Sequence, residues 1–318
     1  MPMQSSEILD RLVARVRFRH LSMLLELRRT GTIGKAAARL HLTQPALSKA
    51  LKEIEDAFGF PIFRRGARGL APTPAGQAVL NGAAVLLAEL GHLNEVTRLS
   101  RQEPAMVLHL GAPSAIGAGM LPAILAKLRA GDERVIVRLS EDPVPRLFER
   151  LVEGELDALL TSYNQAVFST HRSSRLVYEH YLEHKYVVIA PTGSPLARKR
   201  VVTWKELLDM PWILPDSSFL ARQALEGNFL RAGVAVPEPV VTSNHPATTI
   251  QLVAAGVGVS AVPETMMHAE ARIRRVARVR VESMPQAVPT ALVYRAGSAD
   301  HPQLLRLREA MAEMVRAA

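Results

Sequence analysis

A stretch past the middle of the chain has the spacing of a zinc-peptidase site. His180, Glu183 and His184 match the pattern H-x-x-E-H. The pattern requires a helix, because a helix brings both histidines to one metal ion. The surrounding sequence LVYEHYLEHKYVVIA is rich in Tyr and Val and leads into a predicted strand. We therefore expect no metal site at these residues.

Other catalytic and cofactor patterns are missing from the sequence. The chain has no cysteine, which excludes thiolate zinc sites, iron–sulfur clusters, a cysteine nucleophile and disulfides. It contains no G-x-S-x-G and no G-x-x-x-x-G-K, and Gly256-Val257-Gly258 precedes a strand, the wrong order for dinucleotide binding. We expect no cofactor and no enzymatic activity. The alternative is a two-lobed catalytic or small-molecule-binding domain fused to a DNA-binding module, acting as an enzyme.

Positive charge is concentrated near the N-terminus. The 318 residues include 39 basic and 30 acidic side chains, a formal net charge of +9. Residues 11–72 alone hold thirteen basic and four acidic residues, which is also +9, so the remainder of the chain sums to zero. A localised surplus favours a polyanion such as double-stranded DNA over the alternative of a merely solvated surface.

The same segment predicts closely spaced short helices. The first has leucines at helical spacing and ends at Thr30 and Gly31. Thr32 caps the second, in which three alanines at 36–38 allow close helix packing, and residues 41–42 form a tight bend. This order is typical of a helix-turn-helix.

The third helix has the properties of a recognition helix. Thr43 caps it, and Gln44 and Pro45 lie in its first turn. Its apolar residues recur at helical spacing: Leu47, Leu51, Ile54 and Phe58. We expect Gln44, Ser48 and Lys49 to contact base edges and Lys52 to hold a phosphate.

A short hairpin follows Gly59. The sequence PIFRRGARGLAPTPAG predicts two strands joined by a glycine-bearing turn, which is a wing. Its arginines suit the DNA backbone or the minor groove. The complete set of predicted DNA-binding residues is Thr43, Gln44, Pro45, Ser48, Lys49, Lys52, Arg64, Arg65 and Arg68.

Residues 36–76 resemble the winged helix-turn-helix of LysR-type transcriptional regulators. That family has an Ala-Ala pair, a Leu-His turn, Ser/Thr-Gln-Pro-Ala, a Leu-Glu pair, Gly, Leu-Phe-Arg at the start of the wing, and Thr-x-x-Gly. The departures are mild: Ile54-Glu55 replaces Leu-Glu, Ile62-Phe63 replaces Leu-Phe, and Ile33-Gly34 replaces an aromatic residue and Thr. Residues 1–17 are an N-terminal extension, longer than the family usually has. The winged helix-turn-helix is expected at 18–76.

A linker helix is expected at 77–103. Its apolar seam follows heptad spacing: Val79, Ala83, Leu86, Leu90, Leu93 and Thr97. The seam can pack on its own chain or form a dimer, and attachment to a DNA-reading module favours the dimer. The resemblance likewise implies dimerising linker helices, usually within a tetramer.

The remaining residues, 104–318, alternate predicted strands and helices. The order strand–helix–strand predicts α/β architecture with parallel strands, and two such sets predict two lobes with a cleft between them. The resemblance continues at GELDAL (154–159), SPL (194–196) and LVAAGVGV (252–259). It implies an effector domain similar to periplasmic binding proteins, with lobe I at about 105–178 and 284–318 and lobe II at about 179–283.

Polar residues at the ends of predicted strands are candidate effector contacts. Ser114 follows the first strand of this half and precedes a helix, where a hydroxyl and free amides suit a carboxylate. The other candidates are Thr161, Ser162, Ser217 and Asn244. Each of these residue types also caps helices. The resemblance implies an organic acid or an aromatic metabolite as the effector.

The remaining expectations concern partners and location. The N-terminus MPMQSSEILDRLVARVRFRH lacks the apolar core of a signal peptide, and no stretch approaches the ~20 apolar residues of a membrane span. We therefore expect a cytoplasmic protein without a membrane partner. DNA, a small-molecule effector, a homodimer or homotetramer, and RNA polymerase are its candidate partners.

Overall fold

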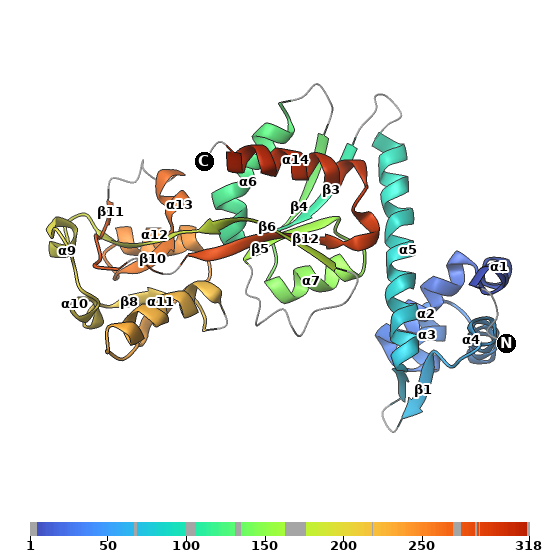
Figure 1. Ribbon diagram of the computed structural model, residues 1–318. Coiled ribbons are helices and arrows are strands. Elements are labelled where there is room, and N and C mark those ends of the chain that lie inside the picture. Colours follow the sequence, from blue (N-terminus) through green and yellow to red (C-terminus); the bar gives the residue numbers. More distant parts are fainter. Residues whose placement is uncertain are drawn as a thin grey trace. The chain divides into compact units, whose positions relative to one another are not determined.

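The computed structural model describes residues 5–66, 69–99, 106–130, 135–162, 176–217, 219–269, 275–283, 285 and 287–316. The chain divides into two compact units, and each is considered by itself (Figure 1). They are Met1–Ala105 with Glu149–Leu156, and Met106–Phe148 with Asp157–Ala318.

The first unit contains the predicted helix-turn-helix and wing. Its elements are α1 (Ser5–Arg15), α2 (Phe18–Thr30), α3 (Ile33–Arg39), α4 (Gln44–Phe58), β1 (Phe63–Gly66), β2 (Gly69–Pro72) and α5 (Pro74–Leu99). The three expected helices and the antiparallel two-stranded wing are confirmed. α1 is a helix within the N-terminal extension that the sequence did not predict.

Local signals in the sequence set the helix ends. The hydroxyl of Thr32 accepts the Lys35 amide at 3.4 Å, and that of Thr43 accepts the Ala46 amide at 3.4 Å. Gly31 closes α2 with a φ of 68°, a left-handed conformation that glycine adopts without strain. These caps satisfy backbone groups that the helices leave unpaired.

A side-chain carboxylate joins α4 to the wing. Glu55 Oε1 accepts the backbone N–H groups of Ile62 at 2.7 Å and of Phe63 at 3.1 Å. Ile62 is fully buried in the core of this unit, together with Leu24, Leu47 and Leu80. The departure from Leu-Glu to Ile54-Glu55 therefore keeps the carboxylate that positions the wing.

The long helix α5 has two different halves. Its first half packs on the winged domain through buried residues: Gly76, Leu80, Ala83 and Ala84. Its second half leaves Leu86, Leu90 and Leu93 exposed by 52%, 44% and 61%. Beyond Ala84, Val85 and Ala88 still lie close to Gly154 of the same unit, but Leu86, Leu90 and Leu93 remain uncovered. The two alternatives for the seam thus apply to different residues of the helix.

The second unit is built on a five-stranded sheet with strand order β4-β3-β5-β12-β6 (Figure 1). The strands are β3 (Met106–Gly111), β4 (Val135–Ser140), β5 (Ala158–Ser162), β6 (Leu176–His184) and β12 (Val288–Arg295). β4, β3 and β5 are parallel, as expected, and α6 (Ser114–Leu128) and α7 (Val144–Val152) follow β3 and β4. β12, which the sequence predicted as a strand without a direction, runs antiparallel to both β5 and β6.

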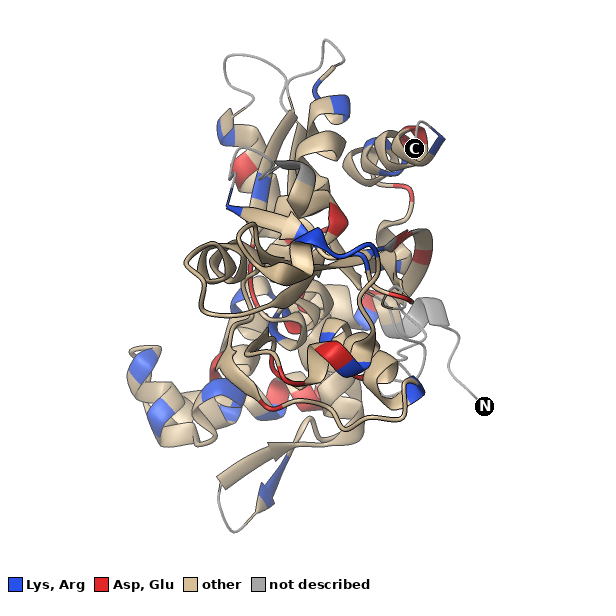
Figure 2. Ribbon diagram, turned by 90° about the vertical axis from the view of Figure 1, so that its left-hand side faces the viewer, with Lys and Arg blue, Asp and Glu red and all other residues tan. Residues whose placement is uncertain are grey.

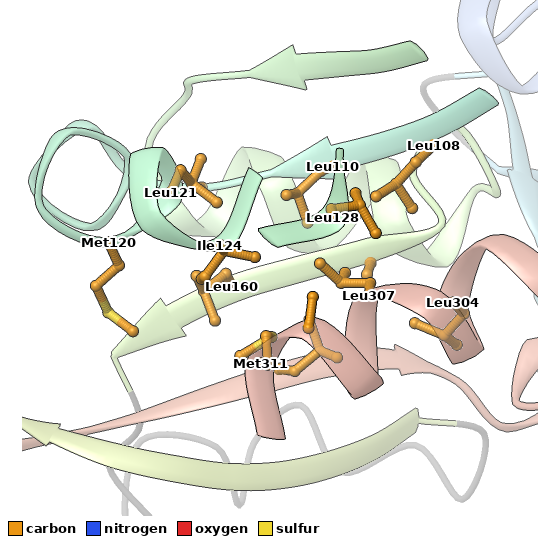
Figure 3. Packing of buried hydrophobic residues seen from close by; sticks show 14 of the residues in the cluster. Leu108, Leu110, Met120, Leu121, Ile124, Leu128, Leu160, Leu304, Leu307 and Met311 are labelled. Carbon is orange, nitrogen blue, oxygen red and sulfur yellow. The ribbon is translucent and has the colours of Figure 1, made fainter. Parts of the chain in front are cut away.

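Helix α6 and the last helix, α14 (Pro302–Arg316), pack on one face of this sheet. Figure 3 shows their apolar side chains meeting those of the strands, among them Ile124, Leu128, Leu160, Leu307 and Met311. All of these side chains are buried. This core defines lobe I.

A polar cluster fixes α14 to two strands of the same sheet. Glu179 on β6 accepts hydrogen bonds from Tyr294 at 2.6 Å and Tyr181 at 2.9 Å, and it pairs with Arg308 at 2.6 Å. Burial raises the pKa of Glu179, but the hydrogen bonds from Tyr294, Arg308 and Tyr181 outweigh it, so the pKa lies below its usual value. The carboxylate stays ionised and holds three elements together.

Strand β6 also carries the H-x-x-E-H pattern. Residues 180–184 are extended, as the sequence context indicated. Backbone positions four residues apart in a strand lie about 13 Å from each other. The chain leaves the first sheet at His184, so its first crossing to the second lobe lies at Lys185, later than the expected boundary near residue 179.

Lobe II contains two small sheets. β7 (Tyr186–Pro191) lies between β10 (Ser260–Pro263) and β11 (Val276–Arg278), and both neighbours are antiparallel to it. β8 (Trp212–Leu214) and β9 (Pro239–Thr242) are parallel. The second βαβ set is therefore confirmed only for β8 and β9. Trp204, Trp212 and Phe229 fill the core with edge-to-face ring contacts at 5.0 and 5.4 Å.

Short helices complete lobe II. They are α9 (Pro195–Arg198), α10 (Trp204–Leu208), α11 (Leu220–Arg231), α12 (Pro246–Ala254) and α13 (Glu264–Ala269), and the 3-10 helix η1 (Ala296–Ser298) follows β12 in lobe I. Throughout the described parts of the chain, every helix is too short or too polar to cross a membrane.

Two glycines of α5 provide a matched test of the packing described above. A Cβ on Gly76 would lie 1.9 Å from the carbonyl oxygen of Ile62, whereas a Cβ on Gly82 meets nothing within 4 Å. We expect Gly76→Ala to destabilise the winged domain by about 1–3 kcal/mol or more, because backbone has to move. Gly82→Ala is expected to stabilise α5 by about 1 kcal/mol through helix propensity. Urea denaturation measures both, and equal effects would contradict this packing.

His20 makes the stability of the winged domain depend on pH. Burial lowers its pKa below the usual 6.5, with help from Arg19 and Arg17, and Glu53 opposes the shift. Its Nδ1 accepts the Arg17 N–H at 3.3 Å, a bond that requires the neutral ring. As the pH falls through 6.5, His20 takes up a proton in the unfolded chain but stays neutral in the folded chain. The free energy of unfolding therefore decreases below that pH.

The comparison variant is His20→Gln, which keeps an acceptor at this helix position and does not titrate. We expect the melting temperature of the wild type to fall more steeply below pH 6.5 than that of His20→Gln. Parallel melting curves for the two proteins across this range would show that His20 does not contribute.

Candidate DNA-binding surface and effector site

The face of α4 opposite the core presents the predicted recognition residues. Thr43, Gln44, Pro45, Lys49 and Lys52 are exposed, and Ser48 is half-buried. The Lys49 side chain is 81% exposed and faces Glu53 only at 4.0 Å. The side chains are thus free to meet a ligand along the first turns of the helix.

Charge changes sign along this face. Lys49 and Lys52 precede Glu53 and Asp56 along this face, and Lys49 is the charged residue of the first half. The positive end of the helix dipole lies at the N-terminal end of α4, ahead of both lysines. A polyanion is therefore attracted to the N-terminal half of α4.

Some of the basic residues of this segment are already paired. Arg29 and Arg39 contact Glu26 at 2.7 and 2.8 Å. The hydrogen bond from Arg29 lowers the pKa of Glu26, with smaller contributions from Arg39. These two arginines are held on their own domain, unlike the lysines of α4.

The wing presents Arg64 and Arg65 on β1. Both side chains are exposed, while the neighbouring Phe63 is buried. Arg68 lies outside the described residues. The wing is held close to its tip, since the Leu70 N–H donates to the Gly31 carbonyl at 2.7 Å.

The N-terminal extension adds a helix beside α4. α1 contacts α4, with Arg11, Leu12 and Val16 half-buried. The Arg11 guanidinium lies 3.8 Å from the position that a Cβ on Gly59 would occupy, at the C-terminal end of α4. A cation at that end interacts favourably with the helix dipole. Apolar spacing gave little sign of this role, because α1 also exposes Leu9 and Val13.

In the second unit, Ser114 lies at hydrogen-bonding distance from a histidine of the other lobe. It begins α6 in lobe I, and its Oγ is 3.2 Å from Nδ1 of His245, the residue before α12 in lobe II. Sequence reasoning missed His245. Its signal was its position directly after Asn244 and before Pro246, at the start of a helix that follows a strand.

Asn244 and Ser217 come close to the same place. Asn244 Oδ1 accepts the backbone N–H of Asp216, next to Ser217, at 2.9 Å. Both Ser217 and Asn244 are exposed. The carboxyl ends of the parallel strands β8 and β9 bring them together, and Asn244 also ties the two loops to each other.

Thr161 and Ser162 end β5 in lobe I. β5 is parallel to β3, so both strands end at the sheet edge from which α6 starts. Thr161 is fully buried and its hydroxyl donates to the Ser162 carbonyl at 3.4 Å, while Ser162 is half-buried. Only Ser162 of this pair has an accessible side chain.

Comparison with known proteins gives the chain a family. Residues 18–77 match the bacterial regulatory helix-turn-helix protein, lysR family, and residues 101–316 match the LysR substrate binding domain. The transcriptional regulator GalR of Pseudomonas putida is 28% identical over 302 residues, covering 93% of this chain and 74% of GalR.

Solved structures share the fold. A full-length OxyR variant from Pseudomonas aeruginosa has a TM-score of 0.62 at 23% identity, covering 94% of this chain and 97% of that one. Full-length CbnR in complex with its target DNA has a TM-score of 0.55 at 20% identity, covering 94% and 100%. The chain belongs to the LysR family and is a DNA-binding transcriptional regulator with an effector-binding domain.

Proposed function

We propose that the N-terminal half of α4 reads the operator. In this proposal Gln44, Ser48 and Lys49 contact base edges, and Thr43 and Pro45 fix the start of the helix against the DNA. The phosphates are held by Lys52, Arg64, Arg65 and Arg68. The observation that carries the proposal is the exposed face of α4, which presents Gln44, Lys49 and Lys52 opposite the buried residues Leu47, Leu51 and Ile54. A side-chain amide such as that of Gln44 is suited to adenine in the major groove.

The second half of α5 is the proposed dimer interface. Leu86, Leu90 and Leu93 recur at heptad spacing and remain exposed on a helix whose first half is already packed. A dimer, alone or within a tetramer, would present two recognition helices to two half-sites.

RNA polymerase is a proposed further partner at the promoter. The proposed location is the cytoplasm, where a bacterial regulator meets its DNA.

Residues 104–318 are the proposed effector-binding domain, after the extension at 1–17, the winged domain at 18–76 and the linker helix at 77–103. We propose that a small carboxylate or aromatic metabolite binds between the two lobes. Ser114 is the proposed central contact, with Ser162, Ser217 and Asn244 around it and Thr161 behind Ser162. Contact between Ser114 and His245 supports this, since it joins the starts of α6 and α12. The amides at helix starts favour an anion.

Gln44→Ala tests the DNA-reading proposal. We expect it to reduce discrimination between an operator selected from a randomised duplex pool and unrelated DNA by about 1–3 kcal/mol. Arg65→Gln is the comparison, because losing a phosphate contact weakens all sequences alike and lowers the salt slope by roughly one unit. Fluorescence anisotropy over a salt series measures both. An unchanged ratio of specific to non-specific affinity in Gln44→Ala contradicts the base-reading role.

Ser114→Ala and His245→Ala test the effector site. The probes are benzoate, succinate and gluconate, and the readout is the rise in melting temperature that a bound ligand produces. We expect at least one probe to raise the melting temperature of the wild type and to bind both variants about tenfold more weakly, a loss of about 1.4 kcal/mol. Ser22→Ala, which removes an exposed hydroxyl from α2, is the control. Equal shifts in all four proteins contradict the proposed site.

A further inference from the structure

Lobe II has a cluster of exposed basic residues that plays no part in the sites described above. Three follow one another at the end of α9, and three lie on and beside β11. We refer to them as the lobe II basic edge: Arg198, Lys199, Arg200, Arg275, Arg278 and Arg280. All six side chains are exposed.

Strand pairing brings these two segments together from about 75 residues apart in the sequence. β11 forms the outer strand of its sheet, beside β7. The Val202 N–H donates to the Arg280 carbonyl at 2.8 Å, and the Glu282 N–H donates to the Val202 carbonyl at 3.0 Å. Figure 2, which faces this end of the unit, shows several Lys and Arg stretches close together there.

Only part of this charge is neutralised. Lys199 pairs with Glu206, and Arg278 pairs with Glu264, each at 2.6 Å. Arg198, Arg200, Arg275 and Arg280 have no ion-pair partner among the residues that the structure describes. The part of the chain beyond the winged domain is close to neutral in sum, yet this edge keeps four exposed arginines that no described acidic residue neutralises.

The composition of the edge indicates which class of partner it fits. Residues 198–202 and 275–283 include no aromatic residue, and Val201 is the exposed apolar residue among them. Protein interfaces depend on buried aromatic and apolar anchors at their centre. The planar guanidinium group of arginine instead donates paired hydrogen bonds to phosphate oxygens. Contacts with phosphate and sugar account for half or more of the hydrogen bonds between proteins and DNA.

We propose that the lobe II basic edge binds the phosphate backbone of DNA beyond the bases read by α4. This rests on the proposed function, because α4 has to bring the DNA to the protein. Contacts to phosphate oxygens carry no sequence information, so in this proposal the edge adds affinity without sequence preference. It therefore contributes more on a long duplex, with flanking DNA on both sides of the operator, than on a duplex trimmed to the operator.

The test compares two triple variants of the full chain with equal charge. The first, Arg200→Gln with Arg275→Gln and Arg280→Gln, removes three unpaired cations of the edge. The control, Arg129→Gln with Arg231→Gln and Arg316→Gln, removes three exposed arginines elsewhere. Since all six positions are exposed, both proteins should fold, and melting curves verify this. Affinity for the long and the trimmed duplex is measured over a salt series.

We expect the edge variant to lose affinity for the long duplex and to reduce the salt slope by up to about three units. The control should match the wild type, as should the edge variant on the trimmed duplex. Equal slopes for both variants on the long duplex would overturn the proposal.

Two further outcomes separate this proposal from its alternatives. If the edge variant keeps its salt slope but its oligomeric state changes in sedimentation, the edge binds an acidic face of a second copy and the proposal is wrong. If Arg65→Gln lowers the slope while the edge variant does not, only the edge proposal fails. Failure of the wild type to distinguish the selected operator would instead count against the proposed function of α4.

Discussion

The backbone of Ile62 is the point at which the DNA-binding unit is held together. Its N–H donates to the carboxylate of Glu55 on α4 at 2.7 Å, and its carbonyl accepts the N–H of Thr73 just before α5 at 2.9 Å. Gly76 of α5 packs so closely on the same carbonyl that no side chain fits between them. Recognition helix, wing and linker helix thus share one buried residue, and a shift in any of them is transmitted to the other two.

This arrangement lets α5 belong to the winged domain and also form the proposed dimer interface. Its first half belongs to the winged domain and contributes Leu80 to that core, with Val79 packed against it. Its second half keeps apolar residues exposed, which is unfavourable in water unless another surface covers them. A helix that is packed on the winged domain at its start and exposes apolar residues further along is well suited to connect DNA binding to dimer formation.

Features set by neighbouring residues were predictable from the sequence, and features set by distant pairing were not. Thr32, Thr43 and Gly31 act within one turn of their own helices, so residue type and spacing identified them. The Tyr- and Val-rich context argued against a helix at residues 180–184, but β6 was not among the predicted strands, because its partner β12 lies more than a hundred residues later. The antiparallel direction of β12 was not predictable for the same reason, since strand direction depends on where the chain returns to the sheet.

The candidate sites divide in the same way. The exposed face of α4 follows from helical spacing, and its residues were identified directly. His245 was missed because its significance comes from Ser114, which lies 131 residues earlier. The lobe II basic edge could not be seen in the net charge of the sequence, because acidic residues elsewhere cancel its charge in the sum. In the structure, acidic residues pair with Lys199 and Arg278 of this edge.

The uninterrupted course of α5 also has a geometric consequence. From Gly76, where the helix is locked to Ile62, to Leu90 on its exposed face are fourteen residues, a rise of about 21 Å. Each residue of helix turns the following side chains by about 100°. The number of residues between these points therefore sets the angle about the helix axis between the winged domain and the exposed leucines. In any dimer formed through these leucines, that angle fixes how the two α4 helices are oriented relative to each other. Adding or deleting a single residue there would change which side of the double helix the second half-site has to occupy.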